Sequence, residues 1–154
     1  MLERPDDLVR LQAAIDRSYD RAGDHLLEVH APERRLDARG LSERLTGMRL
    51  LTLATSTRDG RPITGPVDGI FYRGRFHFGS SPASLRFRHI RERPQVSATH
   101  LPGEELAVTV HGTAEALDLT TGKMVPTGEA AEGDGAAPAP GRDGAPGEPG
   151  APTG

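Results

Sequence analysis

A short run of residues near the middle of the chain carries side chains that are well suited to binding an anion. The aromatic segment Phe76-His77-Phe78 leads into Gly79-Ser80-Ser81-Pro82, and a basic helical pattern then runs from Ser84 to Arg91. Small residues let a phosphate approach the backbone, hydroxyls and the free N–H groups of a helix start donate to its oxygens, and an arginine adds positive charge. The order of these residues predicts a binding site for the phosphate group of a nucleotide-type cofactor.

The same residues also have an ordinary structural explanation. A Gly-Ser-Ser-Pro segment before a helix is a common connection, in which Ser81 or Ser84 serves only as the N-cap. Short motifs match by chance often enough that this turn alone does not decide between the two interpretations.

Composition excludes several classes of function. The net charge is -3, whereas binding to nucleic acid through charge alone would favour a basic face. The chain has no cysteine, which excludes disulfides, thiolate zinc sites and cysteine nucleophiles. It has no apolar run of about 18 residues, and its N-terminal residues are strongly charged, so we expect a soluble cytoplasmic protein without a membrane span.

Hydrophobic spacing predicts an N-terminal helical region over residues 1–40. Apolar residues recur at spacings of three and four, at Leu8, Leu11, Ile15 and Tyr19. This pattern predicts an amphipathic helix that ends at Gly23. A second short helix is expected to begin at Ser42, as its N-cap, and to run through Leu45.

From residue 49 onward the pattern is that of β-strands. Strands are predicted over residues 50–55, 62–72, 76–79, 95–101 and 106–117. Asp59-Gly60 predicts a hairpin between the first two strands, and Pro102-Gly103 predicts the turn between the last two. Gly65 and Pro66 indicate an edge or a bulge where a ligand can approach. Antiparallel strands with one intervening helix predict a mainly β fold built as a small barrel.

The combined pattern resembles the pyridoxamine 5'-phosphate oxidase-like split-barrel family. The resemblance runs from Leu41 to Asp118, through the Asp59-Gly60-Arg61-Pro62 hairpin, the Phe76–Ser81 segment and the Gln95–Ala98 strand. It implies an antiparallel split β-barrel domain over residues 41–125 and a homodimer with FMN at its interface; some relatives use a deazaflavin or haem. It also implies a flavin-dependent oxidoreductase acting on a small organic substrate.

The resemblance assigns cofactor-binding residues by position. Ser80 and Ser81 match hydroxyl positions after the aromatic strand, Ser84 matches the serine that starts the phosphate-binding helix, and Arg86 falls on the family's usual lysine. The strand that runs along the flavin ring is matched by Thr64, Gly65, Pro66 and Val67. No catalytic side chain is assigned, because the redox chemistry would belong to the cofactor.

Two features depart from the family pattern. The vitamin-salvage enzymes carry basic residues on the second strand, where this chain has Thr64 and Gly69. After Leu119 the family continues with a helix and a last barrel strand, whereas this chain passes into residues 126–154, a Gly/Pro/Ala-rich tail that we predict to be disordered. Either the N-terminal region completes the barrel, or the chain is a truncated relative that serves as a non-catalytic binding or regulatory module.

The six histidines and the basic helix are alternative candidate sites. None of the six histidines is spaced as a metal-ligand pair on one helix, so no metal site is predicted. The basic run over residues 86–93 is interpreted as a solvated helix face rather than a nucleic-acid surface.

Overall fold

The computed structural model describes residues 2–125 and 127. The N-terminal part is helical, with α1 (Pro5–Asp20), α2 (Asp24–Val29), η1 (Pro32–Arg34) and α3 (Ala38–Arg44). It is followed by β1 (Met48–Ser56), β2 (Pro62–Tyr72), β3 (Arg75–Phe78), α4 (Leu85–Glu92), β4 (Gln95–Gly103), β5 (Leu106–Thr113), β6 (Ala116–Asp118) and β7 (Lys123–Val125). The predicted tail lies outside the described residues, and the boundaries expected at residues 40 and 125 remain predictions.

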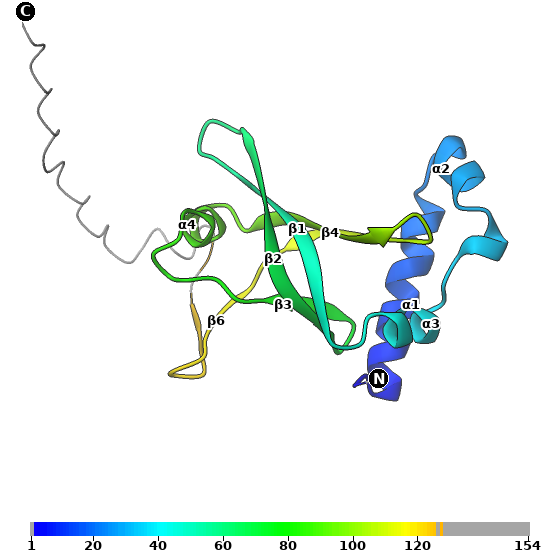
Figure 1. Cartoon of the computed structure of the whole chain (residues 1–154), viewed down its shortest axis with the longest axis horizontal. Helices are drawn as coiled ribbons and strands as arrows, with labels where there is room; N and C mark the ends of the chain where they lie inside the picture. Colours follow the sequence, from blue (N-terminus) through cyan, green and yellow to red (C-terminus); the bar gives the residue numbers. More distant parts are fainter. Residues whose placement is uncertain (1, 126, 128–154) are drawn as a thin grey trace, which may run out of the picture.

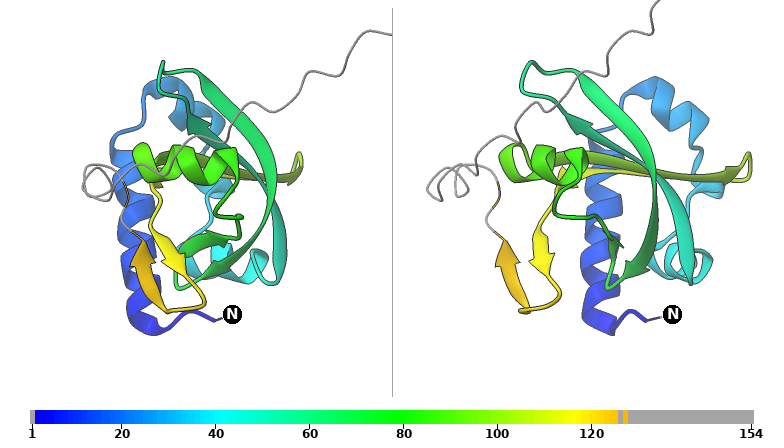
Figure 2. Two further views of the ribbon diagram at one scale, coloured as in Figure 1. Left: turned by 90° about the vertical axis from the view of Figure 1, so that its left-hand side faces the viewer. Right: turned by 60° about the vertical axis from the view of Figure 1, so that its left-hand side comes forward.

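Five of the strands form one antiparallel sheet in the order β3-β2-β1-β4-β5. The sheet curls into a half-barrel, and β6 and β7 form a separate hairpin (Figures 1 and 2). β1 pairs with β2 in an unbroken register from Met48↔Ile70 to Ser56↔Pro62. Gly60, at φ 83°, closes the predicted hairpin between them. The expected mainly β, split-barrel class with N-terminal helices is confirmed.

The core lies on the inner face of the curled sheet. One cluster joins the three central strands through Leu51, Leu53, Val67 and Ala98. A second cluster is built on Leu45, Phe71 and Val108, and it takes in Leu11 of α1 and Leu41 of α3. The N-terminal helices therefore complete the core near the start of β1, while α4 packs against β1 near that strand's C-terminal end.

The structure corrects the prediction that Ser42 is an N-cap. The cap of α3 is Asp37, whose side chain accepts a hydrogen bond from Gly40 N at 2.7 Å. Ser42 lies inside the helix, where its buried hydroxyl donates to the carbonyl oxygen of Ala38 at 2.8 Å. A serine that bonds back to the carbonyl four residues earlier is tolerated in a helix interior.

Two strand ends also differ from prediction. Pro102 and Gly103 belong to β4, whose register shifts between His100 and Gly103, and the turn falls on the next two residues. The strand predicted over residues 106–117 is broken into β5 and β6. The ladder with β4 ends at Gln95↔Thr113: Ala114 N donates to the carbonyl oxygen of Pro94 at 2.7 Å in the next position of that register, but Pro94 has no N–H to return the bond. The short strand β7 was not predicted.

Part of β2 forms an open edge of the sheet. β3 pairs only with Gly69–Tyr72, so in the described part of the chain residues 62–68 have β1 on one side and no strand on the other. The predicted edge at Gly65 and Pro66 is confirmed, and the unbroken register to β1 shows that it is an edge rather than a bulge.

Gly69 lies against the core rather than at a ligand site. A Cβ at this position would lie 2.6 Å from Leu51 Cδ1 and 3.1 Å from the carbonyl oxygen of His77. The chain therefore has no room here for the basic side chain that the vitamin-salvage enzymes carry.

We expect Gly69→Ala to lower the free energy of unfolding by about 1–3 kcal/mol, as overpacking of a close-packed core does. Urea denaturation followed by circular dichroism measures this difference. Gly79→Ala is the matched control, because a Cβ at Gly79 meets nothing within 4 Å. An equal effect of the two substitutions would contradict the assignment of Gly69 to the core.

Candidate functional site

An open cavity of about 280 Å³ lies between the first two strands and the start of α4. β1 contributes Leu53 and Thr55, β2 contributes Ile63, Thr64 and Gly65, and the α4 segment contributes Ser84, Leu85, Arg86 and His89. The cavity thus combines apolar side chains with hydroxyls on its strand walls, and its helix wall carries Ser84, Arg86 and His89 beside Leu85.

Ser84 is the N-cap of α4. Its hydroxyl accepts a hydrogen bond from Phe87 N at 3.1 Å, and Ser80 Oγ lies 2.8 Å from Ser84 Oγ. Ser81 stabilises the preceding turn, where its hydroxyl accepts from Ala83 N at 3.3 Å. The capping explanation therefore holds for Ser84. It does not compete with anion binding, because a hydroxyl that accepts from the backbone still has its own proton to donate.

Arg86 reaches from α4 across Gly65 to the open edge of β2. Its Nη2 donates to the carbonyl oxygen of Pro66 at 3.2 Å, and a Cβ added to Gly65 would lie 3.1 Å from that same nitrogen. A guanidinium carries five N–H donors, and this contact uses one of them. Because Gly65 has no side chain, the Arg86 guanidinium can lie across it. The other N–H donors of Arg86 stay available at the cavity.

The eight predicted cofactor residues differ in how close they lie to the cavity. Thr64, Gly65, Ser84 and Arg86 line the cavity together. Pro66 and Ser80 lie one contact away, through Arg86 and Ser84 respectively, and Ser81 remains in the turn. Val67 packs into the core and is 6% exposed, and it is not among the residues that line the cavity.

Five cavity residues were not predicted: Leu53, Thr55, Ile63, Leu85 and His89. Leu53 and Thr55 alternate along β1, so they share a face of the strand, but the sequence did not show which face meets α4. The sequence could have predicted His89 as a cavity residue. It lies three positions after Arg86, and residues three apart on a helix share a face.

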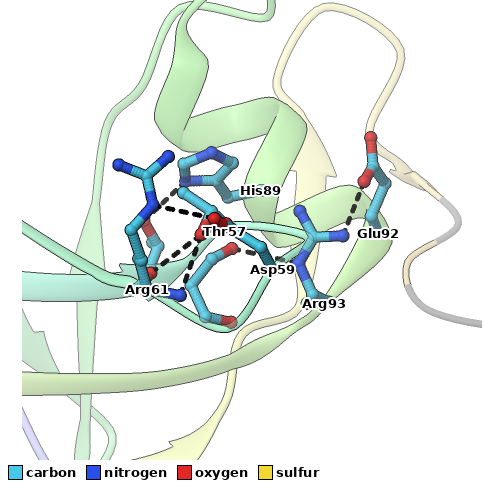
Figure 3. Close-up of polar contacts among 8 residues, drawn as sticks. Thr57, Asp59, Arg61, His89, Glu92 and Arg93 are labelled. Carbon is cyan, nitrogen blue, oxygen red and sulfur yellow. Dashed lines mark hydrogen bonds and ion pairs between the residues drawn. The ribbon is translucent and has the colours of Figure 1, made fainter.

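The C-terminal end of α4 is tied to the end of β1 by Arg93 (Figure 3). Arg93 Nε donates to the carbonyl oxygen of Ser56 at 3.0 Å, and Arg93 Nη1 lies 2.6 Å from Glu92 Oε2. The hydrogen bond from Arg93 lowers the pKa of Glu92 below its ordinary value. In the adjoining hairpin, hydrogen bonds from Thr57 and Arg61 lower the pKa of Asp59.

The Glu92–Arg93 pair predicts a pH-dependent contribution to stability. A carboxyl whose pKa is lowered by folding stabilises the protein above its ordinary pKa of 4.5, and that contribution disappears as pH falls through the lowered value. We expect Glu92→Gln to lower Tm slightly at pH 7 and to leave Tm unchanged once the pH has fallen below the lowered pKa of Glu92. Thermal melts across this range, with Glu104→Gln as the exposed control, measure the difference; a difference that grows in acid would contradict it.

Comparison with known proteins decides the family. The family model described as "Pyridoxamine 5'-phosphate oxidase" matches residues 40–133, which include every residue that lines the cavity. The chain belongs to the pyridoxamine 5'-phosphate oxidase family. No curated protein matches the chain. The predicted family is confirmed, and flavin is the cofactor that members of this family commonly bind.

Two further findings concern the described residues. None of the helices formed by residues 2–125 is both long and apolar enough to cross a membrane. Within the same residues, no group of three or more histidine, aspartate or glutamate side chains could hold a metal ion.

Proposed function

We propose that this member of the pyridoxamine 5'-phosphate oxidase family is an FMN-dependent oxidoreductase that transfers hydride or electrons to or from a small organic substrate. The observation that carries the proposal is the position of Arg86. It joins the start of a helix to the open edge of β2, above a cavity, with most of its donors unused. This is a suitable arrangement for a phosphate monoester.

The donors at the cavity fit the phosphate end of FMN. Arg86 would supply charge, and the hydroxyls of Ser84 and Thr64 would donate to phosphate oxygens. Leu53 and Ile63 line the opposite walls with apolar surface, which lowers the local dielectric and strengthens these contacts. Ser80 would act indirectly by orienting the Ser84 hydroxyl, and Ser81 by shaping the turn.

The size of the cavity limits how much of the cofactor it can hold. Sites for whole small-molecule ligands usually span about 300–1,000 Å³, and this cavity of about 280 Å³ falls just below that range. It suits the phosphate and the neighbouring sugar chain. The ring system would then extend along the open edge of β2 past Gly65 and Pro66, with Val67 supporting that edge from the core.

The bound flavin would supply the redox chemistry, since it accepts and returns hydride or single electrons. The chain's own residues would hold the phosphate and orient the ring along β2. This division of roles accounts for a site that contains no pair of carboxylates and no activated nucleophile among the described residues.

We also propose a homodimer, which is supported by apolar side chains on the outer face of the sheet. Met48 (64% exposed) and Ile70 (43% exposed) pair across β1 and β2. Leu50 (63%) and Leu101 (65%) extend the same face toward β4. An exposed apolar patch of this kind on a sheet marks an interaction surface.

We expect Leu50→Glu to convert the dimer into a monomer, because it would place a charge inside the apolar contact. Sedimentation velocity measures the change. Val9→Glu is the matched control: Val9 is 68% exposed and belongs to α1, not to the sheet. A monomeric unmodified protein, or equal effects of the two substitutions, would contradict the proposed interface.

The oxidoreductase activity is tested by reducing protein-bound FMN under anaerobic conditions and mixing it with a panel of small organic electron acceptors, including quinones and conjugated carbonyl compounds. We expect at least one acceptor to reoxidise the bound flavin faster than it reoxidises free reduced FMN. Reoxidation no faster than that of free FMN across the panel would favour a non-catalytic binding module.

A further inference from the structure

His89 is a buried residue at the cavity that none of the roles described so far uses. Its side chain is 6% exposed, and its Nδ1 lies 3.0 Å from the hydroxyl of Thr55, which is itself 5% exposed. Both residues line the cavity. The contact joins α4 to β1 across 34 positions of sequence, so the ring is held in place from outside its own helix.

The second ring nitrogen of His89 has no hydrogen-bond partner among the described residues. In that part of the chain, the side-chain atoms that are both fully buried and unpartnered are Arg49 Nε and Arg91 Nε. Nε2 of His89 is not one of them, so solvent reaches it. A ring that is more than nine-tenths buried, lines a cavity and leaves one nitrogen open can bind a ligand there.

The contact with Thr55 can set the state of that open nitrogen. A neutral imidazole has one N–H donor and one acceptor nitrogen, and the partner of one nitrogen determines which is which. When the Thr55 hydroxyl donates to Nδ1, the ring proton resides on Nε2. His89 then offers an N–H donor at the cavity, on the same helix face as Arg86.

We propose that His89 is a further anion-binding residue of this cavity, donating from Nε2 to a phosphate oxygen, and that Thr55 positions its ring by holding the Nε2–H tautomer. The inference rests on the proposed function, because it takes the cavity to be the phosphate site. One negative charge lies close by on the same helix, at Glu92, and Arg93 compensates it at 2.6 Å. The net local charge therefore remains favourable for an anion.

NMR of the full-length protein with ¹⁵N-labelled histidine tests the proposal directly. The two-bond ¹H–¹⁵N spectrum distinguishes the two neutral tautomers, and His89→Gln identifies the His89 signals by their disappearance. We expect an Nε2–H tautomer at neutral pH and a shift of the Nε2 resonance on addition of FMN or of inorganic phosphate.

Two pairs of variants separate anion binding from a packing role. His89→Leu keeps the bulk but removes the donor, and we expect FMN to bind roughly 10- to 150-fold more weakly, the range for loss of one hydrogen bond to a charged group. His89→Gln places an amide donor near Nε2 and should restore most of the affinity. Thr55→Val should weaken binding and change the tautomer, whereas Thr55→Ser should do neither.

The outcomes distinguish this inference from the proposed function. FMN binding by the unmodified protein without any shift of His89 Nε2 would overturn the role of His89 and leave the flavin site standing. A shift with inorganic phosphate but no binding of FMN would support the anion-binding role and overturn the flavin assignment. No response to either ligand would overturn both.

Discussion

Replacing Leu51 with alanine is expected to lower the free energy of unfolding by about 2–5 kcal/mol, the range for removing a buried leucine side chain. Leu51 is 0% exposed in the middle of β1, where it packs with Leu53, Val67 and Ala98. β1 is the central strand of the sheet, and its neighbours on both sides contribute to this cluster. The surrounding side chains therefore have little freedom to close the space that the substitution leaves.

Urea denaturation of the apo protein measures the effect of Leu51→Ala. Leu119→Ala is the control, since Leu119 is 88% exposed and its truncation should change stability by less than about 0.5 kcal/mol. Core leucine truncations usually cost about 2–5 kcal/mol. A loss of less than about 1 kcal/mol for Leu51→Ala would therefore contradict the placement of Leu51 in the core.

The second large effect concerns the cofactor. We expect Arg86→Ala to weaken FMN binding by about 1.5–3 kcal/mol, the range for a hydrogen bond to a charged group, which is roughly a 10- to 150-fold rise in Kd. The reason is geometric: Arg86 is the cation that lines the cavity, and its contact with the Pro66 carbonyl holds it over Gly65.

Flavin fluorescence titration measures the change in Kd for Arg86→Ala. Arg88→Ala is the matched control, because Arg88 lies on the same helix, is exposed and does not line the cavity. Equal effects of the two substitutions would show that the helix attracts FMN only through its overall charge. An unchanged Kd for Arg86→Ala would remove Arg86 from the site.

Much of the fold was predictable because local pattern determines it. The 62–72 strand and the Asp59-Gly60 hairpin agree with the structure, since strand alternation and an Asp-Gly turn act over a few residues. The helix after Ser84 was predicted for the same reason, because its N-cap hydroxyl bonds to a backbone N–H three positions away.

The features that the sequence did not reveal depend on contacts between distant segments. Nothing near Ala114 signals that it lies opposite Pro94, which has no N–H to continue the ladder, so that β5 ends there. The Thr55–His89 contact likewise depends on how α4 settles on β1. Leu11 was correctly placed on the apolar face of its helix, but the cluster that this face joins is set by the curl of the sheet.

The residues of the candidate site were likewise predictable only in part. The resemblance brought Ser84 and Arg86 together with Thr64 and Gly65, and the structure places these four residues around one cavity. It also included Val67, which lies further along the same face of β2 and packs into the core instead of lining the cavity. Strand position therefore identified the correct edge of the sheet, whereas the residues of that strand that line the cavity depend on where α4 packs.

The central claim is that this chain binds a flavin, and one measurement tests it most directly. The purified protein is incubated with FMN, excess ligand is removed by gel filtration, and the absorption spectrum of the protein peak is recorded. We predict a flavin band that co-elutes with protein at the size of a dimer and is diminished in Arg86→Ala but retained in Arg88→Ala. A colourless protein peak would contradict FMN binding, and repeating the incubation with a deazaflavin and with haem would show whether another cofactor of this family takes its place.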